Sequence, residues 1–366
     1  MIKHCTFDPM KMKSLKIGDL QIRVPIIQGG MGIGISLSKL ASAVANMGGV
    51  GIISTVGIGL TGPQNKLGWK KGNIEGIRQE IRKARALTEG VLGVNIMAVL
   101  TDFSDLVKTS IEEGIDIIFS GAGLPLDLPS YLVKDQKTML VPIVSSGRAA
   151  NIITQKWKQN YDYLPDAFVV EGPKAGGHLG FKSEALQDVS NKLENLVDEV
   201  VLVAREIKEK FNKDVPVIAA GGLFTGKDIH SIMQRGATGV QLGTRFVATK
   251  ECDASEEFKQ AVIDARDEDI QIIKSPVGMP GRSIFNAFLQ EAADGQRRPK
   301  VCMHNCLRSC NPKTTLYCIA DALFSAFKGN LKDGFAFVGS NAGRIKKMTT
   351  VKEIFTELET EYDQAT

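Results

Sequence analysis

Residues 215–246 read VPVIAAGGLFTGKDIHSIMQRGATGVQLGTRF, and the fold can be predicted from this stretch. Two short apolar runs, Val215–Gly222 and Gly239–Phe246, flank the segment Thr225–Ala237, in which apolar residues recur at helical spacing. Both runs are apolar on both faces, as strands are when helices cover one side and a packed interior fills the other. The stretch therefore predicts two parallel strands joined by a helix.

The same alternation of apolar run and helix-length segment extends along most of the chain. Eight alternations is the number that closes a parallel barrel, so we predict an α/β fold of the (β/α)8 TIM-barrel type. The eight predicted strands are Val24–Gly30, Val50–Thr55, Val91–Met97, Ile115–Ser120, Val141–Ser146, Ala167–Gly172, Val215–Gly222 and Gly239–Phe246.

An open doubly wound sheet is the competing fold, and Gly57–Gly62 (GIGLTG) matches its G-x-G-x-x-G dinucleotide pattern. This match follows the second strand and runs into Pro63 and a polar loop, where a dinucleotide site would need the first strand and the start of a helix. We therefore interpret the match as accidental.

The alternation of apolar runs and helix-length segments ends after the eighth predicted strand. We expect residues 1–250 to form the barrel, residues 251–330 a small helical, Cys-rich lid, and residues 331–366 a return to the barrel with a closing helix. Helix-like segments in this part are Ala254–Arg266, Ser283–Gly295, Cys318–Gly329 and Val351–Tyr362.

Composition excludes several classes of function. The 366 residues are 43% hydrophobic with a formal net charge of +4, which does not favour nucleic-acid binding. The N-terminal residues lack the apolar core of a secretory signal. The uncharged stretch Leu40–Asn65 contains too many glycines for a membrane-spanning helix. Six cysteines, four of them crowded between Cys302 and Cys318, do not form a spread disulfide framework, so we expect a cytoplasmic protein.

Barrel enzymes build their active sites from the loops after the strands. His178 follows the sixth strand through Gly176 and Gly177, whereas His4, His230 and His304 lie in a tail, a predicted helix and the lid. An imidazole that titrates near neutral pH is suited to proton transfer, so His178 is the candidate catalytic residue.

Glycines after the seventh and eighth strands indicate a phosphate site. Gly221, Gly222 and Gly243 either make tight turns or expose backbone N–H groups to a phosphate. Barrels commonly bind phosphate at these two loops, which favours the second interpretation. No G-x-S-x-G nucleophile elbow is present, so hydrolysis is disfavoured.

The Cys-rich segment supports two interpretations. Cys302, Cys306, Cys310 and Cys318 have a spacing compatible with thiolate ligands to zinc or iron, with His304 as a further ligand. Cysteines four apart on a helix would instead pack as small apolar residues on one face. We favour packing and assign no metal from the sequence.

The ordered motifs VPIIQGGMG, GVNI, EGPKAGGHLGF, IAAGGLFTGKDI and GVQLGTRFVAT resemble the nitronate monooxygenase family, formerly called 2-nitropropane dioxygenases. The same group includes flavin-dependent enoyl-acyl-carrier-protein reductases. The resemblance runs from about residue 20 to 250, with a weaker similarity in GSNAGR (339–344). It implies an FMN cofactor over the barrel mouth, with His178 near the flavin. The implied FMN contacts are Gly29, Gly30, Met31, Asn95, Ser145, Gly176, Gly177, Gly221, Gly222, Gly243 and Thr244.

The implied reaction is oxidation of an alkyl nitronate with O₂ to a carbonyl compound and nitrite, with His178 deprotonating a neutral nitroalkane where that is the substrate. One alternative is FMN-dependent reduction of an enoyl thioester by NADH or NADPH. A second alternative is a non-catalytic flavin- or metal-binding protein. The expected partners are small molecules with O₂ or NAD(P)H, without nucleic acid or membrane. The oligomeric state is left open, a homodimer included.

Overall fold

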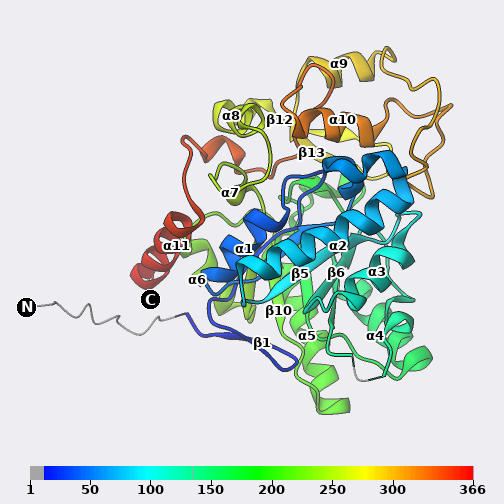
Figure 1. The fold of residues 1–366 in the computed structure, drawn as a ribbon. Coiled ribbons are helices and arrows are strands. Elements are labelled where there is room, and N and C mark those ends of the chain that lie inside the picture. Colours follow the sequence, from blue (N-terminus) through cyan, green and yellow to red (C-terminus); the bar gives the residue numbers. More distant parts are fainter. Residues whose placement is uncertain (1–11, 135, 366) are drawn as a thin grey trace, which may run out of the picture.

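The computed structural model describes residues 12–134 and 136–365. His4 lies outside these residues. Eight parallel strands form one sheet in the order β3-β11-β10-β8-β7-β6-β5-β4, and helices lie along its outside (Figure 1). The strands are β3 (Ile26–Gln28), β4 (Gly51–Ser54), β5 (Leu92–Met97), β6 (Ile117–Gly121), β7 (Met139–Val144), β8 (Phe168–Glu171), β10 (Val217–Ala220) and β11 (Gly239–Leu242).

The sheet closes between β3 and β4. The Gln28 N–H donates to the Val50 carbonyl and the Val50 N–H donates to the Ile26 carbonyl, each at 3.0 Å. The Gln28 side chain, which is fully buried, accepts the Ile52 N–H at 3.0 Å. These bonds satisfy the two strand edges that an open sheet would expose. The predicted TIM barrel is confirmed, and each predicted strand overlaps an observed one, although Thr244–Phe246 of the eighth predicted strand belong to a short helix.

Two apolar cores lie on the two sides of this sheet. The inner core contains inward-facing residues such as Ile52, Phe119 and Val169, and the β1–β2 hairpin adds Leu15 and Ile17 to it. The hairpin consists of β1 (Leu15–Ile17) and β2 (Leu20–Ile22). The outer core joins the strands to the surrounding helices. These are α1 (Ser38–Asn46), α2 (Trp69–Leu87), α3 (Phe103–Glu112), α4 (Gly147–Tyr161), α5 (Leu193–Phe211), α6 (Gly226–Gln234) and α11 (Val351–Ala365).

The connection after β6 departs from the predicted alternation. We expected a helix-length segment there, but the chain forms only the 3-10 helix η3 (Leu128–Tyr131). Pro125 and Pro129 interrupt the helical hydrogen-bond ladder in this segment. The Trp157 indole of α4 donates to the Pro125 carbonyl at 3.0 Å and fixes the loop against the barrel.

The glycine pattern at 57–62 does not begin a long helix. It passes through the 3-10 helices η1 (Ile58–Thr61) and η2 (Pro63–Leu67), which pack against α2. The Gly59 N–H donates to the Asn73 side chain at 2.8 Å, and a Cβ at Gly59 would lie 2.4 Å from the Gly72 carbonyl carbon. These glycines therefore serve helix packing. Among the described residues, no helix is long and apolar enough to cross a membrane.

The segment after β11 covers the carboxyl ends of the strands (Figure 1). It contains the predicted helical pieces α8 (Glu256–Asp264), α9 (Ala287–Ala293) and α10 (Ile319–Phe327), preceded by the short α7 (Thr244–Val247). It also contains a β-hairpin that the sequence did not predict, β12 (Ile270–Lys274) and β13 (Pro280–Ile284). β13 pairs with β9 (Gly177–His178), so the hairpin holds the strand that carries His178. Further 3-10 turns are η4 (Ser183–Gln187), η5 (Val189–Asn191), η6 (Asp267–Asp269) and η7 (Ala342–Arg344).

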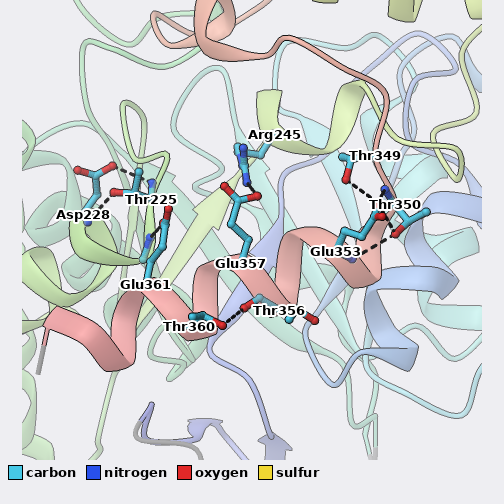
Figure 2. A network of polar contacts seen from close by, with 11 residues as sticks. Thr225, Asp228, Arg245, Thr349, Thr350, Glu353, Thr356, Glu357, Thr360 and Glu361 are labelled. Atoms are coloured by element: carbon cyan, nitrogen blue, oxygen red, sulfur yellow. Dashed lines mark hydrogen bonds and ion pairs between the residues drawn. The ribbon is translucent and has the colours of Figure 1, made fainter.

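The closing helix α11 braces the loops after β10 and β11 (Figure 2). Glu361 accepts the Gly226 N–H at 2.6 Å, and Glu357 forms an ion pair with Arg245 at 2.8 Å. A capping box between Thr225 and Asp228 begins α6 in the same region. The loops after β10 and β11, for which a phosphate site is predicted, are thus both held by α11.

Replacing Gly226 with Ala should lower the free energy of unfolding by about 1–3 kcal/mol, the usual cost of overpacking. The added Cβ would lie 2.2 Å from the Leu358 carbonyl oxygen and 2.3 Å from the Tyr362 nitrogen, so α6 and α11 must separate. Urea unfolding measures the change. The neighbouring exposed Lys227→Ala is the matched control and should stay within about 0.5 kcal/mol of wild type. Equal stability of the two variants would contradict the close α6–α11 contact.

Candidate active site

One cavity lies at the carboxyl ends of the barrel strands, under the segment that follows β11. It brings together residues from the ends of strands far apart in sequence, including Asn95 and His178. All the site residues expected from the sequence line this cavity except Ser145. They are Gly29, Gly30, Met31, Asn95, Gly176, Gly177, His178, Gly221, Gly222, Gly243 and Thr244.

Ser145 lines a second cavity that adjoins the first. Its side chain lies against Gly180, where an added Cβ would be 2.3 Å from the Ser145 Oγ. His178 and Glu171 line both cavities, so the two spaces meet at these side chains. Ser145 is therefore not part of the cavity that the other expected residues line.

His178 is held by the β12–β13 hairpin and by the chain that returns after α10. Its Nε2 lies 2.7 Å from the Ser275 Oγ, directly after β12. Its ring makes an edge contact with Phe337 at 5.0 Å between centroids. Arg282 of β13 donates to the carbonyls of Pro173 and Ala175 at 2.7 and 2.6 Å, which fixes the loop that leads to the histidine.

Burial lowers the pKa of His178 to about 4. The sequence led us to expect an imidazole that titrates near neutral pH, whereas the structure holds it neutral at pH 7 because its surroundings disfavour the charged form. In the tautomer with its proton on Nε2, the imidazole donates to Ser275 and keeps Nδ1 as an acceptor. The neutral imidazole thus presents Nδ1 as an acceptor, and its lowered pKa makes it a weaker base than a free imidazole.

Glu171 is the carboxylate at the end of β8, and it was not among the residues selected from the sequence. Burial raises the pKa of Glu171 to about 7. A carboxyl group with this pKa exists in both protonation states near neutral pH, which suits acid or base chemistry. Its place at a strand end was visible in the sequence, but the apolar surroundings that raise its pKa come from the fold.

One side of the first cavity is built from backbone and cations. Gly221 and Gly222 have φ of +92° and +89°, a backbone conformation that only glycine adopts readily. Lys174 and Arg245 line this side, and the Arg245 guanidinium stacks on Phe224 at 4.4 Å. Positive charge beside exposed backbone is an arrangement suited to a phosphate.

Several buried polar atoms of the cavity have no hydrogen-bond partner within the described part of the chain. They are the Gln241 Oε1, the Ser340 Oγ, the Arg245 Nε and the Trp69 Nε1. Buried polar groups are normally paired, so these atoms indicate a polar ligand in the cavity. Ser340 lies in the GSNAGR stretch, where Gly339 donates to the Thr244 Oγ1 at 2.8 Å and Asn341 donates to the Gly222 carbonyl at 2.7 Å. Residues 339–344, the stretch of weaker similarity to the family, therefore belong to the site.

The family model described as nitronate monooxygenase matches residues 13–361. The chain belongs to this family. Among curated relatives, it is 26% identical over 306 residues to a probable nitronate monooxygenase of Staphylococcus saprophyticus, covering 77% of this chain and 81% of the relative. It is also 28% identical over 276 residues to a hydroxy-methyl-oxo-octahydro-indene-carboxyl-CoA dehydrogenase of Mycobacterium tuberculosis, covering 75% of this chain and 67% of the relative.

Two solved structures are similar to nearly the whole chain. FabK from Thermotoga maritima matches with a TM-score of 0.72 and 29% identity, covering 94% of both chains. A nitroalkane oxidase from Streptomyces ansochromogenes matches with a TM-score of 0.71 over 94% of this chain and 97% of that one, and its 22% identity shows a shared fold. This nitronate monooxygenase family member is therefore an oxidoreductase with a flavin cofactor, which disfavours the non-catalytic alternative.

The lowered pKa of His178 predicts a pH dependence of stability. The unfolded chain binds a proton at this residue below about pH 6.5, whereas the folded chain binds it only below about pH 4, so the contribution to stability falls as pH decreases through this window. Between pH 7 and pH 5, the free energy of unfolding of the apoprotein should fall by about 1–3 kcal/mol less in His178→Asn than in wild type. Urea unfolding at the two pH values measures this difference. The same pH dependence in both proteins would show that His178 is not held neutral.

Proposed function

We propose that this protein is an FMN-dependent nitronate monooxygenase, which oxidises alkyl nitronates with O₂ to a carbonyl compound and nitrite. The observation that carries the proposal is the imidazole of His178, held by Ser275, in one cavity with glycine backbone and two cations that suit a phosphate. The family match over residues 13–361 supports the same reaction class.

The residues fit an FMN. Backbone of Gly221, Gly222, Gly243 and Thr244, together with Lys174 and Arg245, would hold the single phosphate. A Cβ at Gly243 would lie 3.6 Å from the Met31 sulfur and 3.9 Å from the Met31 Cγ, so no tight contact within the protein requires glycine at this position. The flavin, when bound, supplies the two-electron oxidation, while the protein supplies placement and proton transfer.

His178 would act on the substrate carbon. A neutral nitroalkane must lose a carbon-bound proton before it becomes a nitronate, and the Nδ1 of His178 would receive that proton while Ser275 holds Nε2 at 2.7 Å. A nitronate has already lost this proton. Protonated Glu171 adds no negative charge beside such an anionic substrate, and its raised pKa keeps it protonated below about pH 7.

The direct test is aerobic assay of the flavin-loaded protein with propyl nitronate. We expect nitrite release with consumption of O₂. Protein with a full flavin complement that releases no nitrite would contradict the proposed reaction.

His178→Asn should separate the two kinds of substrate. With a neutral nitroalkane, kcat/KM should fall about 10²–10⁴-fold, the usual contribution of a general base. With the pre-formed nitronate, it should change only a few-fold, because no proton is removed from carbon. His230→Asn on α6 is the matched control and should affect neither substrate. Equal losses on both substrates would indicate a positioning role for His178.

Gly243→Ala tests the phosphate end of the site. The added methyl group has room in the apoprotein but would project toward a bound phosphate, so the FMN dissociation constant should rise at least about tenfold. Riboflavin, which lacks the phosphate, should bind wild type and variant with similar affinity. The unfolding midpoint of the apoprotein controls for misfolding. An equal loss of affinity for riboflavin and FMN would place the phosphate elsewhere.

A second candidate function is reduction of an enoyl thioester by NADH or NADPH. The similarity to FabK and to a carboxyl-CoA dehydrogenase favours it. The second cavity, with Lys182 and Lys274 in its lining, offers space and charge for a long thioester substrate that reaches His178. Rapid bleaching of the flavin by NADH and recovery of its colour with a crotonyl thioester would support this function over nitronate oxidation.

A further inference from the structure

The Cys-rich segment lies between α9 and α10 (Figure 1). Residues 302–317 contain no helix, so the interpretation that its cysteines pack on one helical face is wrong. Residues 295–318 form neither a helix nor a strand, and an isolated bridge joins Leu307 to Leu100. Connections longer than about 12–15 residues without secondary structure are uncommon in compact domains and usually serve a function.

Burial of apolar side chains does not hold the first half of this segment. Val301 and Met303 are 68% and 76% exposed. The His304 side chain, by contrast, is 15% exposed, and its ring lies 5.2 Å from the Trp69 ring between centroids. The Thr101 hydroxyl donates to the following carbonyl, that of Asn305, at 2.7 Å. The segment is therefore anchored at His304 and its neighbour.

Three donor groups converge where His304 meets the start of α10. Its Nε2 lies 2.7 Å from the Asp321 Oδ1. Cys318 is the N-cap residue of α10 and Asp321 follows three residues later, a spacing that brings two side chains together at a helix start. The donor atoms of His304, Cys318 and Asp321 all lie within 4.8 Å of one another.

The geometry and the ligand types suit zinc. A tetrahedral zinc ion holds sulfur at about 2.3 Å and nitrogen or oxygen at about 2.0–2.2 Å, which places its ligand atoms roughly 3.3–3.6 Å apart. Widening the contact between His304 and Asp321 by about 0.6 Å would admit the ion. Calcium and magnesium take oxygen ligands, whereas this set offers one sulfur, one nitrogen and one oxygen. The Asp321 side chain is 60% exposed, so water can reach a fourth position.

We infer that His304, Cys318 and Asp321 bind one zinc ion, with water as the fourth ligand. Ile319 and Ala320, between two of the ligands, line the cavity assigned to the flavin, but the three ligands themselves do not. The ion therefore has a structural role, in which it ties the irregular segment to a helix that forms part of the cavity wall. This inference does not depend on which substrate the enzyme oxidises or reduces.

Metal analysis of the flavin-loaded protein tests the inference directly. After dialysis with zinc and removal of the excess, about one zinc ion should remain per chain. Cobalt in place of zinc should give a sulfur-to-cobalt charge-transfer band in the cobalt-minus-zinc difference spectrum, in which the flavin absorption cancels. Less than about a tenth of an ion per chain, or iron together with acid-labile sulfide, would overturn the inference.

Substitutions separate this site from one built of cysteines alone. Cys318→Ser should abolish the charge-transfer band, and Asp321→Asn should raise the zinc dissociation constant at least about tenfold. Cys310→Ser is the matched control, because Cys310 is a partly exposed cysteine of the same segment and is not a ligand. It should keep both the ion and the band. A loss of metal in Cys310→Ser as large as in Cys318→Ser would contradict the assigned ligands.

Proteolysis of the wild-type protein tests the structural role even if the variants fold poorly. Lys300 is an exposed trypsin site in the irregular segment, and cleavage there should be at least several-fold slower with zinc than after zinc is removed. Cleavage after the exposed Lys66 is the internal control and should not depend on zinc. In His304→Ala, zinc should give no protection at Lys300. Equal cleavage of the wild-type protein at Lys300 with and without zinc would overturn the site.

Discussion

Closure of the parallel sheet between β3 and β4 is the constraint on which the site depends. Because all eight strands run in the same direction around a closed circuit, every loop at their carboxyl ends opens on one rim. The buried side chain of Gln28 completes the seam by accepting the Ile52 N–H. Residues as distant in sequence as Gly30 and Gly243 can therefore line one cavity.

The barrel supplies the rim, but the segment after β11 determines the chemistry of His178. Ser275 and Phe337 contact the imidazole from the hairpin and the returning chain, and burial of the imidazole lowers its pKa. The same segment carries the four cysteines and places Cys306 at the cavity. The barrel and the segment after β11 thus make separate contributions to the cavity.

The barrel could be predicted because each strand is a short apolar run that local sequence reveals, as in Val215–Gly222. The place of His178 at the cavity could likewise be predicted, because it follows the sixth strand and active sites of barrels are built from the loops after the strands. The neutral state of His178 could not be predicted, because Ser275 and Phe337 are remote in sequence. The β12–β13 hairpin was missed since its short strands are half exposed and lack a clear apolar alternation. Lys174 and Arg245 could not be selected from the sequence, because only the folded cavity shows that they line the site.

The measurement that tests the account most directly is a crystal structure of the protein with FMN bound. The account predicts the phosphate in contact with backbone at Gly221, Gly222, Gly243 and Thr244, and the flavin ring next to His178. A phosphate bound away from these loops, or a flavin ring out of contact with the imidazole, would contradict it.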